Sequence, residues 1–244
     1  MQGTLEVPVD ALAAAMDAAP YADRLELCSD LAREGWTPDV KLVRTLRDRT
    51  ACELVAMIRP CLTDGDFSLT PAGFRATPAR LEASLEQVAS MASAGAHSVA
   101  IGLLDEAGDI DLPACASLRD AARRLGLGVS FHRAFDLVVD RERGLHDLVA
   151  LGVRRVLTAG VHGWDTSART VADRTRQLER DRHVLERVAS RHDTTPPDVV
   201  ACGGVRADNA AAWLAVTPHL HASCRLGGAF DHDQVRRLRE ILPA

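Results

Sequence analysis

The chain has 244 residues, of which 47% are apolar and 26% charged, and its formal net charge is −5. This mildly acidic composition, with three Trp, five Phe and one Tyr, argues against a nucleic-acid-binding face or a base-stacking surface. No apolar run approaches the roughly 18 residues of a membrane-spanning helix, and the N-terminus lacks the pattern of a secretion signal. We therefore expect a cytoplasmic protein that binds neither nucleic acid nor membranes.

Short apolar segments alternate with amphipathic segments along the whole chain. The predicted strands cover residues 4–9, 24–28, 53–58, 97–103, 128–131, 154–158, 198–202 and 219–223. The predicted helices cover residues 11–19, 39–49, 77–94, 112–125, 141–151, 168–191, 207–216 and 231–241. Eight such units of about 30 residues predict an α/β fold, a single (β/α)8 TIM barrel over residues 1–244. A doubly wound open sheet is the alternative.

The fifth predicted strand is followed by a histidine, an arginine and an aspartate, residue types that are common in active sites. His132, Arg133 and Asp136 come directly after the apolar run 127–131. Charged groups at the end of a buried strand are costly unless they are paired or used. A salt-bridged strand cap is the structural alternative to a functional site.

Polar side chains also stand at other strand ends, and in a TIM barrel these ends meet at one mouth where active sites lie. Carboxylates held near each other and near a histidine have the shifted pKa values that acid–base chemistry needs. Taken singly, each residue is explained as well by an ion pair, for example between Glu6 and Arg59. Taken together, six residues form the predicted catalytic set: Glu6, Glu26, Arg59, His132, Arg133 and Asp136.

Glycine pairs follow the seventh and eighth predicted strands. Gly203 and Gly204 end the seventh strand, and Ser223 ends the eighth strand before the pair 227–228. Barrels commonly bind phosphate here through backbone N–H groups. We therefore predict an anion or phosphate site at Gly203, Gly204 and Ser223, with tight turns as the alternative.

The six cysteines contain no CxxC pair, which favours reduced thiols over a disulfide framework. Four of them fall near the predicted mouth: Cys28, Cys61, Cys202 and Cys224. Thiolates prefer soft ions such as Cu(I), whereas buried cysteines more often only pack.

With these residues in place, the chain resembles the CutC family, which is named for copper homeostasis. The resemblance spans nearly the whole chain and rests on the following motifs, in order: Leu5-Glu6-Val7, the segment 22–28, Thr37-Pro38, Ile58-Arg59-Pro60, Gly65-Asp66-Phe67, the segment 131–136, the segment 155–158 with Gly160, the segment 204–207 with Asn209, and His221-Ala222-Ser223. It implies a (β/α)8 barrel, a cytoplasmic location, a role in copper handling and a homo-oligomer.

The chain departs from the family pattern at the proposed copper ligands. Family members usually carry a cysteine where this chain has Pro8, and that thiol with the second-strand cysteine is the proposed Cu(I) pair. Here only Cys28 remains as the metal ligand that the resemblance implies. Cys61, where the family usually has arginine, is another candidate for a second sulfur ligand. The Arg-Gly-Gly that usually follows Ile-Arg-Pro is altered in this chain.

Two functions stay open at this point, and the sequence does not decide whether the chain is an enzyme. The first is a copper homeostasis protein that binds Cu(I) through Cys28. The second is a TIM-barrel enzyme of the lyase, isomerase or hydrolase type, acting on a small anionic or phosphorylated metabolite. The sequence supports the enzyme's pocket better than the metal site, because the polar mouth residues match the family while one thiol is lost.

Overall fold

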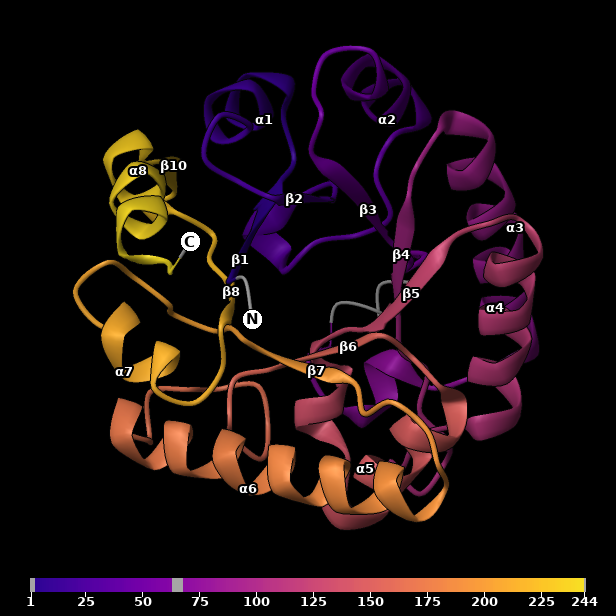
Figure 1. Cartoon of the computed structure of the whole chain (residues 1–244). Coiled ribbons are helices and arrows are strands. Elements are labelled where there is room, and N and C mark those ends of the chain that lie inside the picture. Colours follow the sequence, from indigo (N-terminus) through magenta and orange to yellow (C-terminus); the bar gives the residue numbers. More distant parts are fainter. Residues whose placement is uncertain (1–2, 63–67, 244) are drawn as a thin grey trace.

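The computed structural model describes residues 3–62 and 68–243, in which eight parallel strands form a closed barrel ringed by helices (Figure 1). The strands are β1 (Thr4–Val9), β2 (Arg24–Leu27), β3 (Glu53–Met57), β4 (Ser98–Ile101), β5 (Gly128–Phe131), β6 (Arg155–Thr158), β7 (Asp198–Ala201) and β8 (His219–His221). The helices are α1 (Leu12–Ala18), α2 (Val40–Arg47), α3 (Pro78–Ala94), α4 (Leu112–Arg124), α5 (Arg141–Leu151), α6 (Val171–Arg191), α7 (Ala210–Leu214) and α8 (His232–Ile241). The predicted (β/α)8 barrel is confirmed, and the open sheet is excluded.

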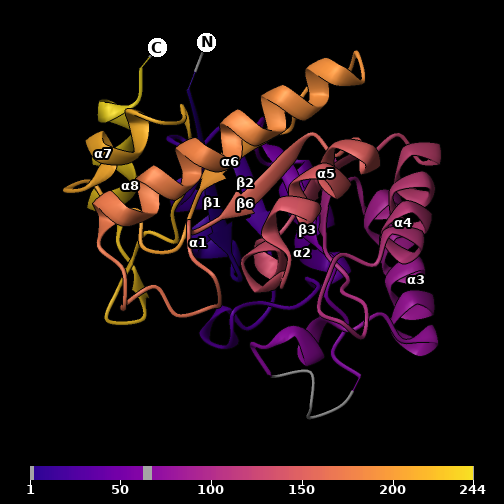
Figure 2. The same ribbon diagram turned by 90° about the horizontal axis from the view of Figure 1, so that it is seen from below.

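Each strand pairs in parallel with the next, and β8 closes the barrel against β1. Viewed from the side, the described part of the chain starts and finishes at the end of the barrel where the strands begin (Figure 2). We call this end the floor and the opposite end, where the strands finish, the mouth.

Strand residues alternate between the helical layer and the barrel interior. On β1, Leu5, Val7 and Val9 are fully buried in the main apolar core, together with strand residues such as Leu25 and Leu27 on β2. Burying a side chain of this size contributes about 1.5–3 kcal/mol. The alternate positions point into the barrel, and many of them are polar, which brings charged groups together inside the molecule.

The observed helices differ from the predicted ones mainly in where they begin and end. The helix predicted over 168–191 begins at Val171, because Thr170 and Asp173 form a reciprocal capping box. The helix predicted over 207–216 is reduced to the five residues of α7. Asn209 ties the segment before α7 to the helix, because its side-chain oxygen accepts hydrogen bonds from the Arg206 N–H and the Trp213 indole.

A short hairpin after β8 was missed in the sequence. Strands β9 (Arg225–Leu226) and β10 (Ala229–Phe230) are antiparallel, and Gly227 and Gly228 connect them. Both glycines have positive φ, 59° and 85°, as a two-residue hairpin turn requires. Gly227 and Gly228 therefore form the tight turn that the sequence analysis gave as the alternative to an anion site.

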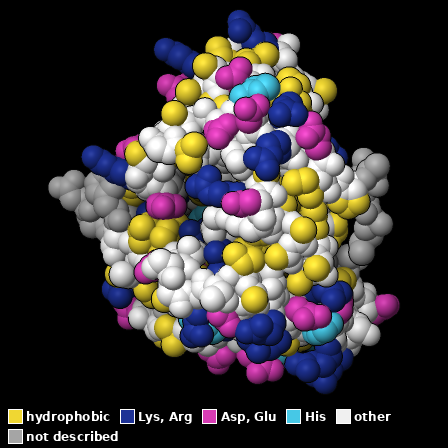
Figure 3. All heavy atoms as spheres, turned by 90° about the vertical axis from the view of Figure 1, so that its left-hand side faces the viewer, with side chains coloured by type: hydrophobic (Ala, Val, Ile, Leu, Met, Phe, Trp, Pro, Cys, Tyr) yellow, Lys and Arg dark blue, Asp and Glu magenta, His cyan; other side chains and the backbone are white. Residues whose placement is uncertain are grey.

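The predicted motif Gly65-Asp66-Phe67 lies outside the described residues, as does Thr63 in the altered Arg-Gly-Gly segment. Within the described ranges, no helix has the length and apolar character to cross a membrane. The face that includes α7 and α8 carries interspersed acidic and basic side chains (Figure 3).

Candidate functional site

A cavity of about 490 Å³ opens at the mouth of the barrel. Seven of the residues predicted from the sequence line it: Glu26, Arg59, His132, Arg133, Gly203, Gly204 and Ser223. Pro8, Phe74, Trp164 and His221 contribute further to its wall. Glu6 and Asp136 are buried beneath the lining and hold lining residues in place.

Glu6 lies at the centre of a buried chain of polar contacts inside the barrel. One carboxylate oxygen accepts a hydrogen bond from Arg24 Nε at 2.7 Å, and the other lies 2.9 Å from His221 Nδ1. The second ring nitrogen of His221 lies 3.7 Å from a carboxylate oxygen of Glu26. Glu6 is thus paired with Arg24 and His221, and these contacts take the place of the ion pair with Arg59 suggested above.

The two glutamates have opposite pKa shifts. Burial alone would raise the pKa of Glu6, but the His221 hydrogen bond and the charge of Arg24 outweigh it and hold the pKa well below its usual range. Burial raises the pKa of Glu26 to about 7, and the attraction of His221 only partly offsets it. The pKa of His221 is raised despite its burial, because Glu26 and Glu6 both favour its charged form.

Glu6, Glu26 and His221 form what we call the Glu–Glu–His cluster. One ligand-type atom from each residue lies within 4.8 Å of the other two. Glu26 is only 3% exposed, and its Oε1 has no hydrogen-bond partner among the described residues. A buried acceptor without a donor is costly, and the cluster offers the carboxylate and imidazole atoms that bind metal ions in proteins.

Cys28 borders the cluster as a thiol. It is 1% exposed, and its Sγ lies 3.9 Å from a carboxylate oxygen of Glu26. Burial and the neighbouring Glu26 raise the pKa of the thiol well above its ordinary value of 9. Of the other cysteines predicted near the mouth, Cys61 is exposed, while Cys202 and Cys224 are buried.

His132 is a neutral side chain in the cavity wall. Its burial and the charge of Arg59 lower its pKa to about 3. Its Nδ1 accepts a hydrogen bond from the Ala134 N–H at 3.2 Å, whereas Nε2 has no partner among the described residues. The ring occupies space that a side chain at Gly102 would fill, since an added Cβ there would lie 2.4 Å from the ring.

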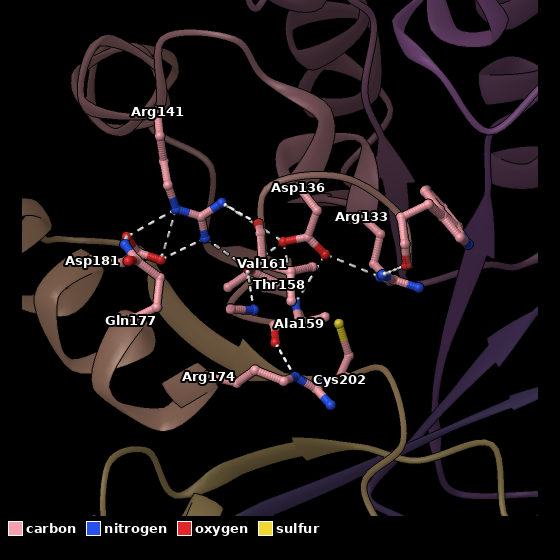
Figure 4. A network of polar contacts seen from close by, with 12 residues as sticks. Arg133, Asp136, Arg141, Thr158, Ala159, Val161, Arg174, Gln177, Asp181 and Cys202 are labelled. Atoms are coloured by element: carbon pink, nitrogen blue, oxygen red, sulfur yellow. Dashed lines mark hydrogen bonds and ion pairs between the residues drawn. The ribbon is translucent and has the colours of Figure 1, made fainter. Parts of the chain in front are cut away.

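Asp136 holds Arg133, a residue of the cavity wall, through a network of buried polar contacts (Figure 4). It is fully buried and accepts hydrogen bonds from Arg133 Nε at 3.1 Å, Thr158 Oγ1 at 2.5 Å and the Ala159 N–H at 2.9 Å. Arg141 continues the network to Asp181 at 2.6 Å. Asp136 is thus a buried ion-pair partner, as the salt-bridged strand cap required, while Arg133 lines the cavity.

Two arginines of the wall are fixed by aromatic rings. The Arg59 guanidinium lies 4.1 Å from the ring centre of Trp36 and 4.6 Å from that of Phe74. Arg133 lies 4.3 Å from the ring centre of Trp164 and donates to the Trp164 carbonyl at 2.9 Å. Stacked guanidinium groups are held rigidly and present their N–H edges to a ligand.

The Gly203-Gly204 turn, where the sequence predicts an anion site with a tight turn as the alternative, lies at the end of β7 and lines the cavity. Both residues have positive φ, 72° and 95°. Arg174 donates to the Gly203 carbonyl at 2.6 Å, and Asn209 donates to the Gly204 carbonyl at 3.0 Å. A Cβ added at Gly204 would meet nothing within 4 Å, so the backbone there is open to the cavity.

Sequence reasoning missed Arg24 and His221 as site residues. Both occupy inward positions of strands, Arg24 at the start of β2 and His221 at the end of β8. The alternation His219-Leu220-His221 was the available signal for the second of these, because it places both histidines on the interior face.

Comparison with known proteins agrees with this architecture. The CutC family pattern matches residues 4–225, nearly the whole chain. The chain belongs to the CutC family. A CutC protein of Xanthomonas campestris pv. campestris strain B100 is 33% identical over 244 residues, which is 98% of this chain and 97% of that protein. A CutC protein of Histophilus somni is 42% identical over 158 residues, which is 64% of this chain and 60% of that protein.

Solved structures show the same fold at lower identity. CutC from Streptococcus agalactiae, which is named for copper homeostasis, has a TM-score of 0.74 at 21% identity, covering 91% of this chain and 98% of its own. The 3-keto-L-gulonate-6-phosphate decarboxylase of Vibrio cholerae has a TM-score of 0.62 at 14% identity, covering 98% and 97%. At these identities the likeness shows the barrel alone.

Proposed function

We propose that this CutC chain takes part in copper homeostasis by binding a copper ion at the Glu–Glu–His cluster. The observation that carries the proposal is that Oε1 of Glu26 has no hydrogen-bond partner among the described residues. It is buried beside a second carboxylate and an imidazole. A bound cation would satisfy this oxygen, favour the ionised form of Glu26 and displace the proton that Glu6 and Glu26 favour on His221. Family membership supplies the link to copper.

The donor set favours Cu(II) over Cu(I). Carboxylate and imidazole ligands suit harder divalent ions, whereas Cu(I) prefers sulfur. Arg24 donates to the Glu6 oxygen that His221 does not contact, as a residue outside the ligand set does when it orients a ligand.

Cys28 is the competing ligand, since its sulfur lies beside Glu26. Its raised thiol pKa opposes thiolate formation, and Pro8 removes the second sulfur of the family pattern. In our proposal Cys28 therefore packs beside the copper ion rather than replacing the cluster.

Calorimetric titration separates these ligand sets. Cu(II), and Cu(I) under anaerobic conditions, are titrated into wild type, Glu26→Gln, Cys28→Ser and the exposed control Glu82→Gln. We expect one Cu(II) per chain, with an affinity that falls by roughly 100-fold in Glu26→Gln and stays unchanged in the other two variants. Absence of stoichiometric copper binding in wild type would reject the proposal, and loss of copper only in Cys28→Ser would assign the thiol instead.

A separate observation favours a second candidate function, an enzyme that acts on a small anionic metabolite. The cavity of about 490 Å³ falls in the range of small-molecule sites. It combines the stacked cation Arg133, the open backbone at Gly204 and Glu26, whose pKa of about 7 suits proton transfer near neutral pH.

In this second function Arg133 and the Gly203-Gly204 turn bind the anionic group, and Glu26 moves a proton to or from the substrate. A thermal-shift series with sugar phosphates and dicarboxylates tests it on metal-free protein. We expect stabilisation by at least one anion in wild type and its loss in Arg133→Gln. Equal shifts in both proteins, or none in either, would remove the anionic metabolite from consideration.

A further inference from the structure

The proposed copper ligands and an arginine with an open N–H edge lie in the wall of the same cavity. Glu26 and His221 of the Glu–Glu–His cluster line the mouth cavity, and so does Arg133. The cavity of about 490 Å³ has room for a small organic ligand beside an ion.

The cluster by itself does not complete the coordination of copper. It supplies one ligand-type atom from each of Glu6, Glu26 and His221, and no further histidine, cysteine or acidic side chain of residues 3–62 and 68–243 joins this group. Cu(II) with nitrogen and oxygen ligands favours square-planar or tetragonal coordination, which needs more ligands than the cluster supplies. The cavity, which Glu26 and His221 line, is where a ligand from outside the chain reaches such an ion.

Arg133 has one end of its guanidinium left for this cavity. Its Nε donates to Asp136 at 3.1 Å, and its Nη2 donates to the Trp164 carbonyl at 2.9 Å. Its Nη1 has no hydrogen-bond partner among the described residues and is not sealed from solvent, and the side chain as a whole is 15% exposed. Ser223 adds an exposed hydroxyl group to the same wall.

The charge of Arg133 reaches the cluster. Burial opposes the charged form of His221 and the two carboxylates of the cluster favour it, so its pKa is raised, while the charge of Arg133 acts against the carboxylates. Two further carboxylates of the cavity wall, Glu34 and Asp165, are exposed, so water and salt screen their repulsion of a bound anion.

We infer, building on the copper proposal, that the mouth cavity binds copper together with a small carboxylate, which ligates the ion through one oxygen and pairs its other oxygen with Arg133. A carboxylate suits both partners, because carboxylate oxygens bind divalent metal ions and also match the N–H edge of a guanidinium. The ion and the carboxylate then bind cooperatively, and each raises the affinity of the other.

Acetate tests this co-ligand on the full chain loaded with one Cu(II), and acetamide serves as the uncharged ligand of the same shape. At constant ionic strength, acetate should shift the d–d absorption band of the bound copper in a saturable way, with one acetate per chain, whereas acetamide should not. The copper content after dialysis shows whether the ion stays on the protein.

Three variants locate the acetate. Arg133→Gln should lower the acetate affinity of the copper-loaded protein at least roughly tenfold, because a charge-assisted hydrogen bond is lost. Arg133→Lys keeps a positive charge beside Asp136 but lacks the planar edge, so it should fold and still bind acetate more weakly than wild type. Glu82→Gln, at an exposed position of α3, is the control and should match wild type.

Linkage provides a measurement that needs no variant. Acetate should raise the copper affinity of wild type, measured against a competing chelator, by the factor by which copper raises the acetate affinity. An absence of copper binding in wild type would reject the copper site and the co-ligand together. Copper that binds without responding to acetate, an equal response to acetamide, or unchanged acetate affinity in the Arg133 variants would overturn the co-ligand alone.

Discussion

Replacing Glu26 by glutamine should stabilise the metal-free protein at alkaline pH. Glu26 is buried with an unpartnered oxygen, and its pKa in the folded chain is about 7 against an ordinary value of 4.5. The folded state therefore holds a proton that the unfolded state releases between these two values, and stability falls as the pH rises through this window. Above pH 7 the ionised carboxyl costs about 3 kcal/mol.

Glutamine keeps the size of the side chain and removes this charge. At pH 8 with a chelator present, Glu26→Gln should raise the free energy of unfolding by up to about 3 kcal/mol, or the melting temperature by roughly 6–12 °C. Near pH 4.5 the two proteins should have similar stability. Urea and thermal unfolding at both pH values measure the effect, with Glu82→Gln on the exposed face of α3 as the control.

Copper should invert this ranking, because wild type gains stability from the bound ion whereas Glu26→Gln has lost a ligand. The reasoning is wrong if Glu26→Gln is less stable than wild type at pH 8 without metal. In that case the Glu26 carboxylate would be an ordinary structural partner of His221.

Two further predictions concern the support of the cavity. Asp136→Asn should lower the free energy of unfolding by about 3 kcal/mol, because Arg133 and Arg141 lose a buried counter-charge. Urea unfolding measures this change. A loss below about 1 kcal/mol would show that the network contributes little to stability. Gly102→Ala should cost about 1–3 kcal/mol, because the added methyl group meets the His132 ring. Combining it with His132→Ala should recover most of that loss, and an additive double variant would place the strain elsewhere.

The sequence by itself determined the barrel and most of the residues around its mouth. Helix periodicity and strand alternation act over a few residues, so they can be read locally. The capping box of Thr170 is equally local, but the predicted helix began two residues before it. The order of the eight units then places Glu26, Arg59, His132 and Arg133 at a common end of the barrel. The hairpin of β9 and β10 was not predicted, because strands of two residues are too short to show an alternating pattern.

Only the tertiary structure decided which interior side chains meet. Glu6 and His221 are 215 positions apart and become neighbours because β8 closes against β1. That closure gives Glu6 its pairing with Arg24 and His221, and leaves an oxygen of Glu26 without a partner. Contacts between side chains depend on register and closure around the whole barrel, whereas strand alternation specifies only that these residues point inward.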